Sequence, residues 1–366
     1  MRGARFKLLL MTIISLPLLF HLLLVGAALF SSNGTADTSS SFSATLWQRY
    51  VLPQEQWPPL AVGAADDLQP LPAPSTQDPE LVRFGAQLFH DPGLSRDGKV
   101  SCASCHKSSH GFADTERVTP GVDGLLGKRN AQSLLDVHLW DTLFWDGRAA
   151  NLEEQAHMPL EDPVEMASTR QHAVDYVSDK YGESAWSEIA RALSAFQRTL
   201  TLHEHPDNRL DQFLWAVDDG DVALASSLLT DQELHGLHLF RTKAGCIRCH
   251  SGALLSDQEF HVTGFHYYGR RFEDLGRWEH EQRIENLAAF RTPMLRGLMQ
   301  HQPWMHNGLF NDLRGIVRQY SHGGPRPRRP ASLPLVMPYP ETTAELMPFS
   351  LTREEEDALL AFLQML

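Results

Sequence analysis

Two short stretches of the sequence contain the residues best suited to chemistry, and both have the form Cys-x-x-Cys-His. Together they use all four cysteines of the chain. Their residues are Cys102, Cys105 and His106 in the first copy and Cys246, Cys249 and His250 in the second. In an exported protein this spacing is typical of covalent haem attachment, in which both thiols add to the haem vinyl groups and the histidine reaches the iron. The sequence therefore predicts two covalently bound haem c groups.

Two other uses of these cysteines fit the pattern less well. Each Cys-x-x-Cys pair can form a disulfide outside the cytosol, but neither pair lies in a thioredoxin-like βαβ context. The four cysteines together can also bind one zinc ion. Both alternatives leave the two adjacent histidines without a role.

The second axial ligand of each iron decides what a haem does, because an open position admits peroxide whereas a strong protein ligand favours electron transfer. Several Met, His and Tyr side chains are candidates for this position. Those considered for the first haem are His110, His138 and His157, and those for the second are Met294, Met299, His301, Met305, His306, Tyr320 and His322. Spacing alone does not choose among them, since such residues are more often simply packed or hydrogen-bonded.

Helical segments are expected to position both motifs. Residues 81–91 ("LVRFGAQLFHD") precede the first motif, residues 234–242 ("LHGLHLFRT") precede the second, and each pattern predicts an amphipathic helix. Both segments contain Gly-x-x-Leu-Phe, and the second follows a capping box formed by Thr230 and Glu233. This weak internal repeat predicts two similar modules, one after the other.

The other periodic segments are helical as well. Residues 184–200 place large apolar side chains at spacings of three and four, from Trp186 to Leu200. The C-terminal segment begins with a capping box at Thr352 and carries an apolar stripe to the end of the chain. Only residues 259–269 offer a short hairpin. The sequence thus predicts a mostly α fold of two tandem cytochrome-c-like domains, each with one haem.

The N-terminus carries a segment that exports the chain. Arg2, Arg5 and Lys7 precede a predominantly apolar run from Leu8 to Phe30, which is long enough to cross a bilayer. The basic residues should stay in the cytoplasm, so the rest of the chain is expected in the periplasm. We favour a retained anchor at residues 1–30 over a cleaved signal peptide, and both place the protein in the same compartment.

Composition sets the domain organisation and excludes some partners. The chain has 366 residues, 42% of them hydrophobic and 21% charged, as expected of a globular protein with two domains. Residues 31–77 are rich in Ser, Thr, Pro and Ala and predict a linker, and the two domains are predicted at 78–220 and 221–366. The net charge of −13 argues against nucleic acid as a partner.

A resemblance to a known family rests on four further stretches. These are "FWDGRAANLEEQAHMPLEDPVEM" at 144–166, "GKRN" at 127–130, "RTPMLRG" at 291–297 and "PWMHNG" at 303–308. With two haem motifs, the chain resembles the bacterial di-haem cytochrome c peroxidases and their relative MauG. The resemblance implies that Trp145 lies between the haems, that Glu165 is the acid–base residue above the peroxidatic haem, and that Gln155 shares its pocket.

The resemblance also implies a calcium site between the haems. Asn130 matches one of its ligands, and the backbone near His301 and Pro303 matches the others. Position 301 is usually threonine in the family, so this chain departs from the pattern at one ligand.

Two departures indicate the branch of the family. Peroxidases that need reductive activation close the first haem with a histidine at the position of Val122 and bind the second iron with a methionine at the position of Tyr320. The resemblance to MauG therefore implies an open first haem and a tyrosine ligand to the second. An anionic tyrosinate would favour high oxidation states of the second iron.

Three functions follow as hypotheses. The first is a MauG-like enzyme that reacts with hydrogen peroxide and oxidises a protein partner in the periplasm. The second is a peroxidase that reduces hydrogen peroxide with electrons from a small periplasmic protein. The third is a di-haem electron carrier without catalysis. Val122 and Tyr320 favour the first over the second, and Glu165 disfavours the third.

Overall fold

The computed structural model describes residues 37–334, 336 and 338–366, with side chains from residue 42 onward. By internal contacts the chain divides into the units Met1–Thr45 and Leu46–Leu366. The second unit contains both Cys-x-x-Cys-His motifs and every residue predicted to take part in the site. The predicted apolar segment Leu8–Phe30 lies outside the described residues. Within those residues, no helix has the length and apolar character needed to span a membrane.

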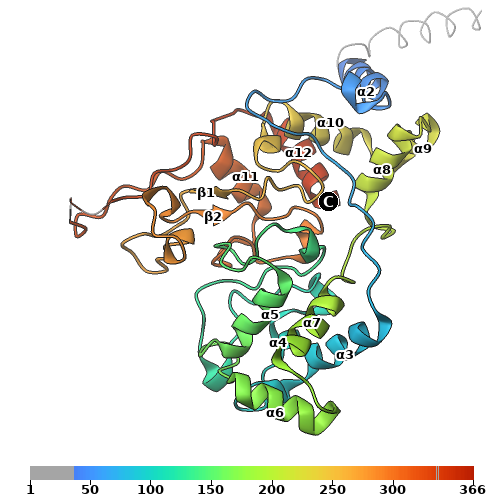
Figure 1. Ribbon diagram of the computed structural model, residues 1–366. Helices are drawn as coiled ribbons and strands as arrows, with labels where there is room; N and C mark the ends of the chain where they lie inside the picture. Colours follow the sequence, from blue (N-terminus) through green and yellow to red (C-terminus); the bar gives the residue numbers. More distant parts are fainter. Residues whose placement is uncertain (1–36, 335, 337) are drawn as a thin grey trace, which may run out of the picture. The chain divides into compact units, whose positions relative to one another are not determined.

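Helices dominate the described chain, which confirms the mostly α prediction (Figure 1). The helices are α2 (Asp37–Tyr50), α3 (Pro79–His90), α4 (Cys102–Cys105), α5 (Leu152–Glu161), α6 (Arg170–Tyr181), α7 (Trp186–Gln197), α8 (Arg209–Asp218), α9 (Val222–Leu228), α10 (Asp231–Arg241), α11 (Leu313–Ser321) and α12 (Arg353–Met365). The strands are β1 (Phe260–His261) and β2 (Phe290–Arg291). Short 3₁₀ turns connect many of these elements.

The internal repeat has a structural cause in how its two helices pack. Helix α3 crosses α7, and α10 crosses α12. A Cβ atom added at Gly85 of α3 would lie 1.9 Å from the carbonyl oxygen of Ala192, and one at Gly236 of α10 would lie 2.1 Å from that of Ala358. The glycine of Gly-x-x-Leu-Phe therefore permits each close crossing, and its Leu-Phe pair is buried beneath.

The helix boundaries follow from local sequence signals. Asp78 caps α3 with Pro79 at the first helical position, and the capping boxes predicted at Thr230 and Thr352 begin α10 and α12. The short strand β1 lies inside the segment predicted to form a hairpin. Its partner is β2, far along the chain, with Phe260 opposite Arg291.

Two hydrophobic cores lie under the two motifs. The first is built from α3, α5, α6 and α7, and the second from α8, α10, α11 and α12. The structure differs here from the linker predicted at 31–77. Tyr50, Trp57 and Leu68 are buried in the second core and Leu71 in the first, so this part of the segment packs as a strap. Its single large side chains have no helical period, which is why the sequence pattern did not reveal them.

Candidate active site

The first Cys-x-x-Cys-His motif forms a single helical turn with a fixed histidine. Ser101 and Ser104 make a reciprocal capping box at the start of α4. The His106 Nδ1 donates to the carbonyl of Phe112 over 2.9 Å, which leaves Nε2 available. Burial raises the pKa of the Cys102 and Cys105 thiols to about 12, so both are neutral at physiological pH.

The second motif repeats this arrangement. Gly245 precedes it with a φ of 66°, and His250 Nδ1 donates to the carbonyl of Leu255 over 2.9 Å. A backbone carbonyl that holds Nδ1–H fixes the tautomer and the orientation of a metal-binding imidazole. Both histidines therefore present Nε2 in the form that binds iron.

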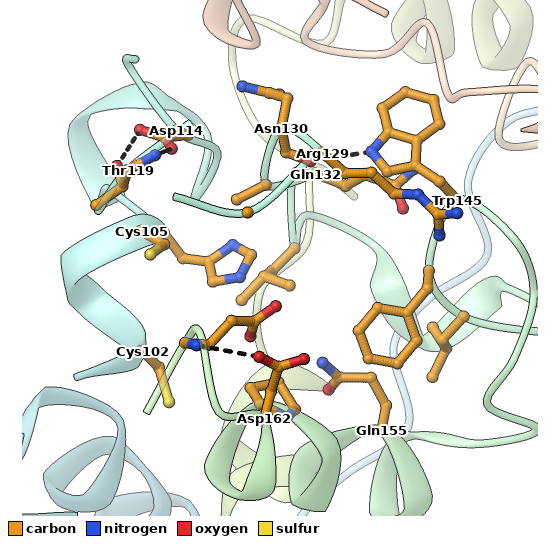
Figure 2. A pocket seen from close by; sticks show the side chains of 18 of the residues that line it. Cys102, Cys105, Asp114, Thr119, Arg129, Asn130, Gln132, Trp145, Gln155 and Asp162 are labelled. Atoms are coloured by element: carbon orange, nitrogen blue, oxygen red, sulfur yellow. Dashed lines mark hydrogen bonds between the residues drawn. The ribbon is translucent and has the colours of Figure 1, made fainter. Parts of the chain in front are cut away.

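A large cavity opens beside the first motif (Figure 2). Its volume is about 720 Å³, within the range of pockets that hold cofactors. Cys102 and Cys105 lie along one side of it, and Trp145 and Gln155 lie across from them. Glu165 lines the same cavity. The structure thus brings together the first haem motif and all three residues that the resemblance assigns to catalysis.

Arg291 tests whether this cavity suits a haem. Its guanidinium is buried, stacks 3.7 Å from the ring centroid of Trp140, and donates to the carbonyl of Thr142. Its Nε has no hydrogen-bond partner in the described part of the chain, and no carboxylate there pairs with it. Burial lowers the pKa of Arg291 to about 9. A buried cation on the cavity wall needs an anion, and the propionate carboxylates of a haem supply one, so the residues fit the group.

Glu165 has the properties of a proton carrier. Its side chain faces the cavity and is accessible from it, while protein surrounds its other sides. Burial and, to a smaller extent, the negative charge of Asp162 raise the pKa of Glu165 to about 7, and Arg148 opposes them. A carboxyl of this kind exchanges protons easily near neutral pH.

Val122 lies directly behind Glu165. Its side chain is fully buried, and its N–H donates to the carbonyl of Glu165 over 2.9 Å. A Cβ atom at Gly121 would lie 1.9 Å from the carbonyl oxygen of Val164, so the two backbones are in close contact. The loop at 121–125 therefore supports the turn at 163–166 that carries Glu165.

Trp145 connects the cavity with the second half of the chain. Its Nε1 donates to the carbonyl of Asn130 over 2.9 Å, and its own carbonyl accepts the N–H of Arg291. The ring of His306 meets it edge-on with centroids 6.4 Å apart and stacks on Phe290 at 3.7 Å. The indole is thus buried between segments of both halves.

Tyr320 lies near the second motif. It lies in the last turn of α11, packs against the second core, and meets Phe265 edge-on at 6.2 Å between ring centroids. Burial raises the pKa of Tyr320, and charge on Cys249 and Cys246 would raise it further. The phenol is therefore neutral unless a metal ion displaces its proton.

Four other candidates for an axial ligand are exposed or pack against other residues. His110, Met299 and His322 are exposed. His157 stacks on Trp186 with ring centroids 4.2 Å apart. Tyr320, which packs against the second core, stays the predicted ligand of the second iron.

The predicted calcium site stays a prediction. Asn130 is buried, and its Nδ2 donates to the carbonyls of Glu116 and Arg117. His301 has a buried Nε2 without a partner among the described residues, and burial lowers the pKa of His301 to about 4. Pro303 follows a cis peptide bond.

Sequence reasoning missed four polar residues of the two sites. Arg148 and Arg291 belong to the quoted stretches "FWDGR" and "RTPMLRG". Arg148 is half-buried and pairs with Asp146, and Arg291 is singled out by its burial and its missing partner. Beside Cys249, His261 and Asp257 form an ion pair of 2.8 Å. Burial opposes the charge on His261, yet Asp257 and Cys249 raise the pKa of His261 to about 10.

Known proteins resemble this chain over most of its length. The family model for di-haem cytochrome c peroxidase matches residues 79–218. The methylamine utilization protein MauG of Methylorubrum extorquens is 32% identical over 352 residues, which cover 92% of this chain and 88% of that protein. The cytochrome c551 peroxidase of Nitrosomonas europaea is 30% identical over 68% of this chain and 74% of its own. The crystal structure of a MauG-like protein associated with microbial copper homeostasis superimposes with a TM-score of 0.62 at 28% identity, over 82% of this chain and 92% of that one.

Proposed function

The chain belongs to the di-haem cytochrome c peroxidase family and is a peroxidase-type oxidoreductase, and from this premise we propose that it acts in the manner of MauG. In this proposal it reacts with hydrogen peroxide at an open first haem without prior reduction and shares the oxidising equivalents with the second haem. It then oxidises a protein partner. The observation that carries the proposal is Val122, which is buried and bonded to Glu165 at the position of the closing histidine.

The chain's own residues would hold both haems. Cys102 and Cys105 would attach the first and Cys246 and Cys249 the second, with His106 and His250 as the proximal iron ligands. Arg291 would pair with a carboxylate of the first haem. Each haem supplies, when bound, an iron that exchanges electrons and, where a position is open, cleaves the O–O bond of peroxide.

Glu165 is proposed to move the proton. Peroxide that enters the cavity must lose a proton from one oxygen and gain one on the other. With a pKa of about 7, Glu165 is partly ionised near neutral pH, so it can accept the first proton and return it. Gln155 lines the same cavity and can orient the peroxide by hydrogen bonding.

Trp145 is proposed to connect the two redox sites. Its burial, its fixed N–H bond to Asn130 and its edge contact with His306 support this role. Tyr320 is proposed as the second iron ligand of the second haem. Because burial keeps its phenol neutral, ferric iron must displace the proton, and the resulting anion would stabilise the higher oxidation state.

The architecture and location belong to the same proposal. Residues 78–220 and 221–366 would be two cytochrome c domains, which the paired glycine crossings and the two cores support. The body would lie in the periplasm, anchored or exported by residues 8–30. A calcium ion bound by Asn130 and by the backbone near His301 and Pro303 would join the two domains.

Rapid mixing of the diferric full-length protein with one equivalent of hydrogen peroxide tests the proposal. No reductant is added, and visible and near-infrared spectra are recorded. We expect a fast Soret change and a long-lived oxidised species. No change until a reductant is supplied would contradict an open first haem and favour a reductively activated peroxidase. No change even then would indicate an electron carrier.

A further inference from the structure

Five arginines form an unneutralised patch on a protein of net charge −13. We call them the arginine patch: Arg117, Arg270, Arg271, Arg326 and Arg328. Within the described residues none of the five forms an ion pair, whereas most other arginines there do. Four of them are exposed and Arg117 is partly exposed. Their charges are therefore directed to solvent.

Contacts between two loops hold the patch together. The Arg270 Nη2 donates to the carbonyl of Arg328 over 2.7 Å, which joins the loop after β1 to the loop after α11. A Cβ atom at Gly269 would lie 3.1 Å from Pro330, so the two loops are also in close contact at this point. The neighbouring Glu273 is exposed, and its carboxylate accepts the N–H of Gly269 and forms no ion pair with these arginines.

An exposed aromatic ring lies among these charges. Phe272 keeps 38% of its surface exposed. The guanidinium carbons of Arg271 and Arg117 lie 4.7 and 5.4 Å from the centroid of its ring. Arginine and aromatic side chains together are typical of the centre of protein–protein interfaces. A basic segment that binds a membrane surface instead pairs its charges with an apolar helix face, and this patch lies on loops.

The patch is continuous with the proposed second haem site. Its second loop begins at the end of α11, whose last turn contains Tyr320. The residue packed on Tyr320 is Phe265, at the start of the first loop. A partner seated on these loops would lie close to the second haem.

We propose that the arginine patch, with Phe272 at its centre, is the docking surface for an acidic protein that exchanges electrons with the second haem. The inference rests on the proposed function for its redox role, but the binding itself does not. Complementary charges increase the rate of association and weaken with added salt.

Binding of plastocyanin, an acidic blue-copper protein, tests the surface. The full-length holoprotein is titrated into isotope-labelled plastocyanin at low and high ionic strength, with the basic horse cytochrome c as the opposite probe. We compare the wild type with Arg326→Glu/Arg328→Glu. The control, Arg83→Glu/Arg191→Glu, makes the same change of net charge on exposed residues of α3 and α7. The patch variant should bind plastocyanin about tenfold more weakly at low salt, and the control within about twofold of wild type.

Several results would overturn the proposal. Equal weakening of plastocyanin binding in both variants would mean that only the net charge of the protein matters. If the wild type binds cytochrome c more strongly than plastocyanin, the surface does not select an acidic partner. Patch-dependent binding to vesicles of anionic lipid, without binding of plastocyanin, would identify a membrane-binding surface instead. The peroxide reaction without a partner is measured in parallel, so a failure of the proposed function is distinguished from a failure of docking.

Discussion

Glu165 and Tyr320 show how the same main cause, burial, prepares two side chains for different tasks. For both, burial raises the pKa. The pKa of Glu165 reaches about 7, so its proton is exchangeable near neutral pH. The phenol of Tyr320 keeps its proton throughout the physiological range and becomes an anion only on binding a cation. One residue is thus suited to proton transfer and the other to metal binding.

Replacement of Glu165 by Gln should slow the peroxide reaction by about 10²–10⁴-fold, the usual effect of removing an acid–base group. The fraction of Glu165 in its basic form increases as pH rises through about 7. The wild-type rate should therefore increase with pH around pH 7 and be lower at more acidic pH. The variant should lose this dependence while both haems stay bound. Stopped-flow absorbance over a pH series measures both effects. Glu161→Gln, an exposed change at the end of α5, is the matched control, and unchanged kinetics in the Glu165 variant would refute the assigned role.

Replacement of Tyr320 by His should convert the second haem to a bis-histidine site. Loss of an anionic ligand should raise the midpoint potential of that haem. Axial ligands shift haem potentials over a range of roughly 0.8 V, and the expected rise is a part of that range. Spectroelectrochemistry measures the potential, and low-temperature electron paramagnetic resonance identifies the ligands. Tyr320→Phe, which removes only the hydroxyl, should leave a five-coordinate iron. If Tyr320→Phe has the wild-type spectrum, another residue is the ligand.

At the scale of elements, the glycines of the repeated Gly-x-x-Leu-Phe set the distance between helices. Gly85→Ala should destabilise the holoprotein by about 1–3 kcal/mol, because the new methyl group would overlap the Ala192 carbonyl. Alanine otherwise stabilises a helix by about 1 kcal/mol over glycine, so the sign is diagnostic. Gly315→Ala in α11 is the control, since only the mobile end of the Asp312 side chain lies nearby. Urea unfolding followed by circular dichroism gives both values, and equal stability of the two variants would contradict the explanation.

The strap at 46–71 shows which elements the sequence could not predict. Helices α7 and α12 have apolar stripes, and α12 also has a capping box, so both helices and the start of α12 were predictable. The strap is held instead by contacts with distant residues: Ala61 donates to the Arg241 carbonyl, and the Leu71 N–H donates to Asp211 over 2.8 Å. Such partners are set by the tertiary fold and leave no periodic signal.

The residues of the candidate site also fall into those that the sequence could predict and those that it could not. The Cys-x-x-Cys-His motifs were predictable because residue type and spacing alone specify the chemistry. Glu165 was assigned only through the resemblance, since its raised pKa comes from residues that surround it in space. Arg291 was not assigned at all, because an arginine is notable only once its burial and its lack of a carboxylate partner are known.

At the scale of the whole molecule, one arginine fastens the two halves beside Trp145. Arg129 donates to Asp146 over 2.6 Å in the first half and to Asp274 over 2.8 Å in the second. Burial alone would raise the pKa of both aspartates, but their bonds to Arg129 hold each pKa below its usual value. The next residue, Asn130, accepts the indole N–H of Trp145 and donates to the His306 carbonyl. Loss of Arg129 should therefore affect both stability and the connection between the haems.

Arg129→Gln should destabilise the holoprotein by about 3–5 kcal/mol near pH 7, because it leaves the buried Asp274 without its cation and removes one of the two arginines that pair with Asp146. Carboxyls whose pKa is lowered by folding stabilise the wild type above the unfolded pKa of about 4 and lose that contribution as pH falls through the folded value. The difference in the free energy of unfolding between variant and wild type should therefore shrink near pH 4, which urea unfolding at both pH values measures.

The control is Lys128→Gln, which breaks only an exposed pair with Glu279 and should cost less than about 1 kcal/mol. A loss that is the same at both pH values, or the same in both variants, would mean that the buried ion pairs do not join the halves. Slower sharing of oxidising equivalents after peroxide in Arg129→Gln, with a normal first reaction at Glu165, would show that the same residue also keeps Trp145 in position.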